Sequence, residues 1–348
     1  MQTPAIVIDL DIVKQNIRRF QAYADSAGLK VRPHIKTHKL PKLAELQLEA
    51  GAVGITCQKI SEAQAMVAAS PLICDVLITY NIVGAEKLVE LVALAQQVRL
   101  SVVADSAAVI DGLSQAFAGE PAPLTVLVEC NTGANRCGVS LPGEAAELAA
   151  RIAGADGLVF GGLMTFPPVG GGAAVQAFMT EAKAIIEAIG LAVPVITSGG
   201  TPDMNSAGEV PVVTEHRPGT YIYNDRSLVS GGRCGWEDCA LTVLATVVSV
   251  PAPNRAIVDA GSKTLTSDLF GLTGHGHVLG RDDISIDSLS EEHGRLVTQG
   301  PIGLAVGDLV TIVPNHACVV MNMVDFVTVR SKEGGDEIWP VPARGKIW

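Results

Sequence analysis

Short, continuously apolar segments alternate with helix-like segments from about residue 15 to residue 220. A buried apolar strand followed by an amphipathic helix is typical of a parallel sheet that helices cover on both faces. The predicted strands are Ala52–Cys57, Val76–Tyr80, Leu100–Asp105, Thr125–Glu129, Val159–Met164 and Val195–Ser198. The predicted helices include Asp11–Ala27, Ser61–Ala69, Ala85–Gln97, Pro142–Ala153 and Ala174–Ile189.

This alternation predicts a closed (β/α)8 barrel over residues 10–225, since seven or eight strand–helix units fit into that length. A doubly wound open sheet is the structural alternative. Polar residues follow the carboxyl ends of the predicted strands, where the chemistry of such barrels takes place. These residues are Lys36, Gln58, Asn81, Asp105, Asn131, Thr165 and Ser198.

The pattern changes after about residue 226, where β-rich segments are separated by Gly, Pro and Asn and no helical periodicity is evident. The predicted strands there are Cys239–Val250, Arg255–Val258, Leu309–Val313 and Phe326–Arg330. We therefore expect a second, smaller all-β domain over residues 226–348, joined by residues 1–9 through a strand at Pro4–Ile8.

Composition narrows the class of protein. The 348 residues are 48% hydrophobic and 18% charged, with a net charge of −11, a mean hydropathy of +0.35 and a pI near 5.1. The chain can bury large cores and is not disordered. Its acidity argues against nucleic acid as a partner. Early acidic residues argue against a signal peptide, and no apolar run reaches the ~20 residues of a membrane span. We expect a cytoplasmic protein.

The seven cysteines are odd in number and scattered, and none forms a Cys-x-x-Cys pair. This usage is typical of a reduced compartment and argues against both a disulfide scaffold and a closed structural zinc site.

Two glycine-containing loops follow the last predicted barrel strands, TSGGTP at residues 197–202 and RPGTY at residues 217–221. Glycine lets backbone N–H groups approach an anion closely, and Ser and Thr hydroxyls add donors. Loops of this kind after late barrel strands are typical of a phosphate site, although ordinary turns use the same residues. The candidate donors are Ser198, Gly199, Gly200, Thr201, Gly219, Thr220 and Tyr221.

The segment RPHIKTHK at residues 32–39 places Lys36 at the end of the first predicted barrel strand. One interpretation is a solvated basic turn. The other is a buried nucleophile, because a lysine with a lowered pKa forms a Schiff base with an aldehyde. A phosphate site in the same barrel indicates pyridoxal 5'-phosphate (PLP) as that aldehyde. Arg136, after the strand 125–129, would then face the phenolic oxygen of the ring, unless it is a solvated loop arginine.

The predicted β domain holds two His-containing pairs. His316 and Cys318 are two residues apart, and on a strand such residues point to the same face. An imidazole and a thiolate form half of a tetrahedral zinc site and leave positions open for water or substrate. A core cysteine beside a hydrogen-bonded histidine is the alternative. His275 and His277 form a second same-face pair, in a glycine-rich segment typical of a mobile loop.

Eight segments, in order along the chain, together resemble the D-threonine aldolase / D-serine dehydratase family of fold-type III PLP enzymes, which have an alanine-racemase-like barrel. The resemblance spans essentially the whole sequence. The segments are TPAIVIDLDIV, RPHIKTHK, GITCQKISEA, NTGANRCGV, TSGGTPD, RPGTYIYND, VDAGSKTLTSD and PNHACVVMN.

The resemblance implies a homodimeric enzyme that binds PLP and acts on a D-amino acid with a β-hydroxyl group. Lys36 would be the Schiff-base lysine, with Gln58 and Arg136 near the ring. His316 and Cys318 would hold a divalent metal (Zn, Mn or Mg) beside the β-hydroxyl. The phosphate would be bound by Ser198, Gly199, Gly200, Gly219, Thr220 and Tyr221.

The resemblance leaves the reaction open between two branches. His-x-Cys is the metal pair associated with the dehydratases, whereas the surrounding segment and the C-terminal WPVPARGKIW favour the aldolase-like branch. We expect a D-threonine aldolase-type lyase that yields glycine and an aldehyde. The alternative is a D-serine or D-3-hydroxyaspartate dehydratase that yields a 2-oxo acid and ammonia. A racemase would need a second base, often a tyrosine of the β domain, and a non-catalytic PLP carrier would generally lack that domain.

One segment departs from the family pattern. Many members carry a Tyr and then a His after the strand that here ends at Met164, but this chain has Thr165-Phe166-Pro167-Pro168 followed by glycines. The departure bears on the choice of substrate and on the reaction branch.

Overall fold

The computed structural model describes all 348 residues, and the chain divides into two compact units. The barrel unit comprises Arg18–Lys36, Pro41–Gly219 and Lys346–Trp348. The β unit comprises Met1–Ile17, Thr37–Leu40 and Thr220–Gly345.

The barrel unit contains eight parallel strands in the order β2-β9-β8-β7-β6-β5-β4-β3. A parallel bridge between His34 and Thr56 joins the two ends of this order, so the sheet is closed. The prediction of a (β/α)8 barrel is confirmed over the open-sheet alternative. The strands are β2 (Lys30–Val31), β3 (Ile55–Cys57), β4 (Asp75–Ile78), β5 (Arg99–Ala104), β6 (Leu124–Cys130), β7 (Leu158–Thr165), β8 (Val195–Ser198) and β9 (Glu215–His216).

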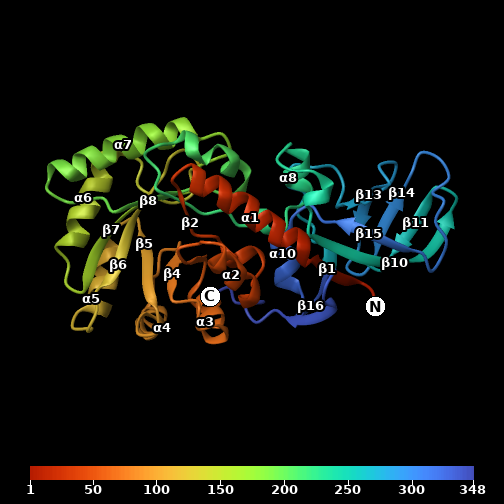
Figure 1. The fold of residues 1–348 in the computed structure, drawn as a ribbon, viewed down its shortest axis with the longest axis horizontal. Helices are drawn as coiled ribbons and strands as arrows, with labels where there is room; N and C mark the ends of the chain where they lie inside the picture. The colour runs from red at the N-terminus through yellow and green to blue at the C-terminus, as the bar shows by residue number, and fades with distance from the viewer. The chain divides into compact units, whose positions relative to one another are not determined.

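Helices alternate with these strands and lie outside them (Figure 1). In α7 the buried residues Val175, Met179, Ala182 and Ile186 recur at helical spacing and form one apolar face. After β8 the chain forms a 3-10 helix, η2 (Thr201–Glu209), in place of an α-helix. The α-helices are α1 (Leu10–Ser26, which begins in the β unit), α2 (Pro41–Glu49), α3 (Ile60–Ala69), α4 (Ala85–Ala95), α5 (Ala107–Phe117), α6 (Pro142–Ala153) and α7 (Gly172–Ala188).

Side chains fill the barrel interior. Leu77, Val103, Leu127 and Met164 come from four consecutive strands and form one buried apolar cluster. Because side chains alternate along a strand, the residue two positions after each of the first three also points inward, nearer the carboxyl end of the strands. The apolar cluster therefore lies inside the barrel, further from the carboxyl ends of the strands than the polar residues of the candidate site.

The β unit is built on a nine-stranded sheet with the path β13-β14-β11-β10-β1-β16-β17, and β15 pairs with both β10 and β12. Residues Leu241–Val247 of β10 alternate between buried and half-buried positions, as expected for a sheet with one face in the core. The N-terminal strand β1 pairs with β10 and β16. The strands are β1 (Ala5–Asp9), β10 (Leu241–Ala252), β11 (Arg255–Val258), β12 (His277–Val278), β13 (Ser285–Leu289), β14 (Gly294–Val297), β15 (Leu309–Val313), β16 (Phe326–Ser331) and β17 (Gly335–Pro340).

The expectation of an all-β second domain is wrong in one respect, because this unit also contains three short helices. They are α8 (Arg226–Ser230), α9 (Ser262–Leu265) and α10 (Ala317–Met323). None is longer than two turns, so none repeats its apolar positions often enough to show helical periodicity in the sequence. No helix in the structure combines the length and the apolar character that a membrane crossing requires.

Candidate functional site

The segment RPHIKTHK is not a solvated turn. His34, Thr37, His38 and Lys39 are all buried, and Lys36 is half-buried. The chain forms a single 3-10 turn, η1 (Ile35–Thr37), three residues after the end of β2. The solvated interpretation of the two lysines and two histidines is therefore wrong, and Lys36 sits in a segment that its neighbours hold in place.

A chain of hydrogen bonds fixes Gln58 beside this turn. The imidazole Nε2 of His34 lies 3.1 Å from Gln58 Oε1, and Gln58 Nε2 donates to the carbonyl of Thr79 at 2.9 Å. The backbone N–H of Lys36 approaches His34 Nδ1 at 3.4 Å. The structure thus links Lys36 and Gln58, two of the predicted cofactor residues, through His34. The sequence motif contains His34, but the prediction gave it no role.

The two predicted phosphate loops meet in the barrel unit. The backbone N–H of Gly219 donates to Thr201 Oγ1 at 3.2 Å, and both Ser198 and Thr201 are buried. Gly199 has a φ of +97°, and a Cβ built there would lie 1.9 Å from Cε1 of His216. Only glycine fits this position, because the backbone passes directly over the imidazole ring.

The imidazole of His216 contacts the backbone of the first phosphate loop at Gly199 and Gly200. Its Nε2 lies 3.1 Å from the carbonyl oxygen of Gly200. Burial lowers the pKa of His216 to about 4, so the imidazole is neutral at physiological pH. Gly200 is extended, and a Cβ there would meet only Phe166 and Pro202, at 3.4 Å and 3.8 Å. The other two predicted phosphate donors, Thr220 and Tyr221, lie in η3 (Thr220–Ile222) of the β unit.

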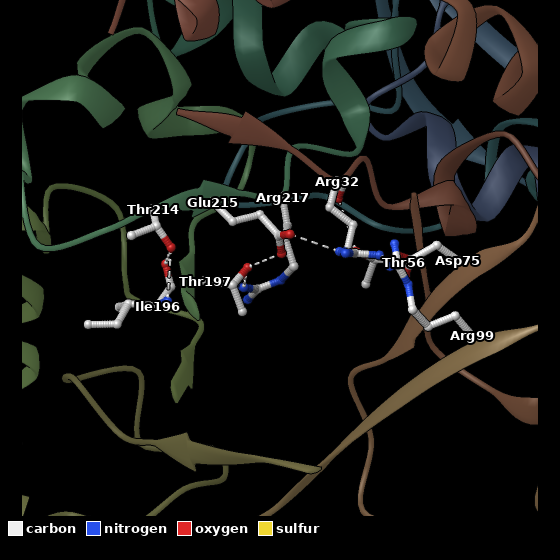
Figure 2. Close-up of polar contacts among 9 residues, drawn as sticks. All are labelled: Arg32, Thr56, Asp75, Arg99, Ile196, Thr197, Thr214, Glu215 and Arg217. Carbon is white, nitrogen blue, oxygen red and sulfur yellow. Dashed lines mark hydrogen bonds and ion pairs between the residues drawn. The ribbon is translucent and has the colours of Figure 1, made fainter. Parts of the chain in front are cut away.

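A buried polar network runs through the barrel from the amino ends of the strands towards their carboxyl ends (Figure 2). Arg32 pairs with Asp75 at 2.6 Å and with Glu215 at 2.9 Å. Glu215 accepts a hydrogen bond from Thr197 Oγ1 at 2.7 Å, and Thr197 in turn accepts one from Arg217 at 2.6 Å. The guanidinium of Arg217 is fully buried, which lowers its pKa to about 10.

This network reaches the carboxyl end of β7 through Arg217, which donates to the carbonyl of Thr165 at 2.7 Å. Thr165 is the first residue of the segment that departs from the family pattern. Its hydroxyl lies 2.7 Å from that of Thr132. The backbone at the departure is therefore held by buried donors. The sequence showed only scattered Arg and Glu residues, so it did not reveal this network.

Arg136 and Phe166 lie together at the same end of the barrel. The guanidinium carbon of Arg136 stands 4.7 Å from the ring centroid of Phe166, a cation–π geometry. Burial raises the pKa of the nearby Glu129, which the charges of Arg136 and Arg217 oppose. Arg136 is exposed and its ring partner is 41% exposed, so both border open space.

His316 and Cys318 do come together, but not on a strand. His316 is the N-cap residue of α10, and Cys318 lies in its first turn. The predicted strand geometry is therefore wrong, because the chain turns into a helix after β15. The two side chains still lie close enough for Cys318 to influence the pKa of His316. Burial alone would lower the pKa of His316, but the bond to Asp225 and the neighbouring Cys318 raise it to about 10 in the absence of a metal.

Asp225 orients His316. Its Oδ2 lies 2.9 Å from His316 Nδ1, and the carboxylate is completely buried. A carboxylate that holds one ring nitrogen fixes the tautomer and leaves Nε2 for a metal. Asp225 ends the segment RPGTYIYND, but the prediction gave it no role, since a residue that acts through another carries no spacing signal of its own.

Hydroxyl groups surround the sulfur of Cys318. Thr37 Oγ1 lies 3.2 Å from Cys318 Sγ, and Thr220 Oγ1 lies 3.8 Å from it. The hydroxyl of Tyr223 is buried without a hydrogen-bond partner, and burial raises the pKa of this phenol. Hydroxyl donors stabilise a thiolate, the form of cysteine that binds metals. A half-tetrahedral N/S pair with a bare buried hydroxyl beside it fits a divalent metal that carries water.

His275 and His277 do not add ligands to this pair. The ring of His277 stacks on Trp236 with centroids 3.9 Å apart, and its Nε2 lies 3.6 Å from Asp282. No group of three or more His, Cys, Asp or Glu side chains is arranged to hold a metal. The pair His316 and Cys318 therefore stands as a two-residue site, which leaves coordination positions open.

For PLP, the donor set of the barrel unit matches the chemistry of the cofactor. A half-buried amine is present at Lys36, and buried hydroxyls and glycines lie at the carboxyl ends of β8 and β9. Gly199 and Gly200 leave the loop without side chains, so its backbone can approach a phosphate closely.

Comparisons with known proteins agree with this geometry. The family described as "Alanine racemase, N-terminal domain" matches residues 8–227, and a serine dehydratase domain family matches residues 240–330. The chain is 34% identical to a D-threonine aldolase of an Arthrobacter species, over 99% of this chain and 93% of that protein. It belongs to the alanine-racemase-like family of D-threonine aldolase and its relatives.

Two solved structures of this family resemble the chain over its full length. The structure of D-threonine aldolase from Filomicrobium marinum matches with a TM-score of 0.93 and 34% identity, and covers 100% of this chain and 97% of that one. A cysteine-to-alanine mutant of D-threo-3-hydroxyaspartate dehydratase, described as the metal-free form, matches with a TM-score of 0.88 and 29% identity, and covers 100% and 98%. Both an aldolase and a dehydratase therefore share this fold.

Proposed function

We propose that the protein is a PLP- and divalent-metal-dependent lyase that acts on D-β-hydroxy amino acids and cleaves them to glycine and an aldehyde, as a D-threonine aldolase does. The similarity to aldolases over the whole chain supports the reaction class. The buried segment around Lys36 and the two phosphate loops support the cofactor.

The barrel unit would hold PLP. Lys36 supplies the amine that anchors the aldehyde, and Gln58, fixed by His34, lies beside the turn that carries it. Arg136 supplies a positive charge for the phenolic oxygen. The barrel unit's donors for the phosphate would be Ser198, Gly199, Gly200, Thr201 and Gly219. Thr220 and Tyr221, which belong to the β unit, stay predictions from the sequence.

The β unit would hold the metal through His316 and Cys318. Bound PLP supplies an electron sink, and a bound divalent cation polarises the β-hydroxyl. The chain keeps His316 in the tautomer that exposes Nε2, because Asp225 holds Nδ1 at 2.9 Å. The hydroxyls of Thr37 and Thr220 lie 3.2 Å and 3.8 Å from Cys318 Sγ, where they could donate to the sulfur of a metal-bound thiolate. Zn²⁺ accepts such a nitrogen and sulfur pair readily, whereas Mg²⁺ prefers oxygen.

The observation that carries this proposal is the pairing of His316 and Cys318 with a buried carboxylate behind the histidine. A racemase or a non-catalytic PLP carrier has no use for a metal pair. The pair instead suits a reaction in which an oxygen of the substrate must be polarised.

A dehydratase that yields a 2-oxo acid and ammonia is the second candidate. The presence of Cys318 in the proposed metal pair favours this candidate. The related dehydratase whose cysteine was replaced by alanine is described as being in the metal-free form. A cytoplasmic location and a homodimer stay predictions.

Cys318→Ala tests the proposal, with Cys74→Ala as the matched control because Cys74 is exposed and has no place in the site. We expect Cys318→Ala to lose bound metal and turnover but to keep the absorbance of bound PLP. The control should keep all three. Turnover that survives both Cys318→Ala and a chelator would contradict the metal part of the proposal.

A further inference from the structure

An aromatic side chain lies against the proposed metal histidine. The ring of Phe270 packs on the imidazole of His316, with centroids 4.4 Å apart and planes inclined by 33°. Phe270 is 57% exposed and the preceding Leu269 is 43% exposed. Both belong to the segment of residues 268–274, named here the Phe270 loop. A ring that stays more than half exposed contributes little to the core, so packing does not account for its position.

The backbone of this loop is strained where it presents the ring. Phe270 has a φ of +52°, in the left-handed region that bulky side chains rarely adopt. Thr266, just before the loop, also has a positive φ, of +64°. Strain of this kind persists where surrounding contacts enforce it, and it clusters at ligand sites.

Two polar side chains enforce the conformation of the Phe270 loop. Asn315 Nδ2 donates to the carbonyls of Asp268 at 3.1 Å and Gly274 at 2.8 Å, one at each end of the loop. Arg226 donates to the carbonyls of Thr273 at 2.8 Å and Gly274 at 3.2 Å. Arg226 directly follows Asp225 in the sequence, and Asn315 directly precedes His316. The same segments that build the metal site therefore also hold the loop.

Leu269 and Phe270 give the Phe270 loop an exposed apolar surface, and the one charged side chain of the loop, Asp268, is exposed and negative. The cation that contacts it, Arg226, directs its terminal nitrogens to backbone carbonyls and to the side chain of Asn315. It is therefore engaged by the loop itself. A carboxylate placed against Phe270 and Leu269 would lose water and gain no ion pair there.

We propose that Phe270 is a specificity-determining residue that favours apolar, and above all aromatic, β-substituents over a β-carboxylate. The β-carbon of the substrate carries both the hydroxyl and the substituent, so a substituent lies two bonds from the oxygen that the metal polarises. Because Phe270 packs on a ligand of that metal, its exposed face lies where the substituent projects. This inference rests on the proposed function.

The test compares Phe270→Ala with Phe326→Ala, a phenylalanine of similar exposure (62%) on β16 of the same unit, whereas the ring contact of His316 is with Phe270. The substrates are D-threonine, D-phenylserine and D-3-hydroxyaspartate. Aromatic contacts predict that Phe270→Ala lowers the ratio of kcat/KM for phenylserine to that for threonine by about three- to tenfold. Phe326→Ala should leave this ratio unchanged, and Phe270→Arg should shift preference towards 3-hydroxyaspartate.

A second readout does not depend on turnover. In PLP-loaded protein stripped of metal, dissociation constants for the same three compounds are taken from the cofactor's absorbance, and the affinity for Mn²⁺ is measured separately. Phe270→Ala should weaken phenylserine selectively and leave Mn²⁺ affinity unchanged. The role of Phe270 is refuted if wild type turns over these substrates but Phe270→Ala changes neither the kcat/KM ratio of phenylserine to threonine nor the ratio of their dissociation constants. If wild type neither binds nor cleaves any of them, the proposed function itself fails.

Discussion

Replacing Asp225 by asparagine tests whether a buried carboxylate prepares His316 for a metal. The carboxylate accepts four hydrogen bonds. Oδ2 receives His316 Nδ1 at 2.9 Å and the N–H of Ala317 at 3.1 Å, while Oδ1 receives Ser227 Oγ at 2.6 Å and the N–H of Leu228 at 3.3 Å. The backbone N–H groups of Leu228 and Ala317 cannot accept a hydrogen bond, and one of them lies at each carboxylate oxygen, so an NH₂ group at either oxygen would face a donor.

The asparagine amide would place an NH₂ group against donors on one of these two sides. The bonds to Ser227 and Leu228 survive only if the amide oxygen takes the place of Oδ1, which turns the NH₂ group towards His316. The imidazole of His316 would then accept a hydrogen bond at Nδ1 and carry its proton on Nε2. Nε2 is the nitrogen proposed to bind the metal, so this proton would block coordination. Loss of such a partner typically weakens metal affinity about 10- to 100-fold, which corresponds to about 1.4–2.8 kcal/mol.

The assay is the dissociation constant for Zn²⁺ or Mn²⁺ in PLP-loaded protein, measured by competition with a chromogenic chelator. Ser227→Ala is the matched control, because it removes one donor to the same carboxylate and leaves the bond to His316 intact. We expect this control to bind metal nearly as tightly as wild type. If Asp225→Asn also binds metal like wild type, or if both variants weaken equally, the positioning role of Asp225 is refuted.

Three further changes test the cofactor site and the barrel. Lys36→Ala should abolish the Schiff-base absorbance near ~420 nm, and absorbance that persists would remove Lys36 from its role. Gly199→Ala should cost more than about 2 kcal/mol of unfolding free energy and loosen PLP, because of its positive φ and the 1.9 Å approach to His216, whereas Gly200→Ala should leave the unfolding free energy near that of wild type. The lowered pKa of His216, about 4 against 6.5 in the unfolded chain, contributes stability that is full above pH 6.5 and lost towards pH 4. Urea titrations should therefore show the difference between wild type and His216→Gln shrinking by about 2 kcal/mol from pH 7.5 to pH 5, and a constant difference would contradict the assignment.

The barrel was predictable because its signal is repeated. Each apolar strand and each amphipathic helix restates the same alternation, so errors of a few residues at element ends do not change the fold. The short helices of the β unit had no such redundancy. Helix α10 holds only seven residues, and its apolar start Ala317-Cys318-Val319-Val320 reads equally well as a strand.

The residues of the candidate site also differ in how far the sequence could predict them. Residues within short motifs, such as Lys36, His316 and Cys318, could be named from spacing and chemistry, and their roles stay predictions. Asp225 and Phe270 could not, because they act on the site through residues far away in the sequence, and only the folded chain shows the contact. The pairing of His316 with Cys318 was anticipated from the wrong geometry, since an N-cap residue and the second residue of a helix can also face each other.

Product analysis tests the central claim most directly. Purified protein with PLP and Mn²⁺ or Zn²⁺ is given D-threonine, D-serine and D-3-hydroxyaspartate, and glycine, aldehyde, 2-oxo acid and ammonia are followed together. Glycine and an aldehyde in equal amounts, lost on chelation and restored by metal, are the predicted result. A 2-oxo acid and ammonia without glycine would contradict the aldolase assignment and establish the dehydratase.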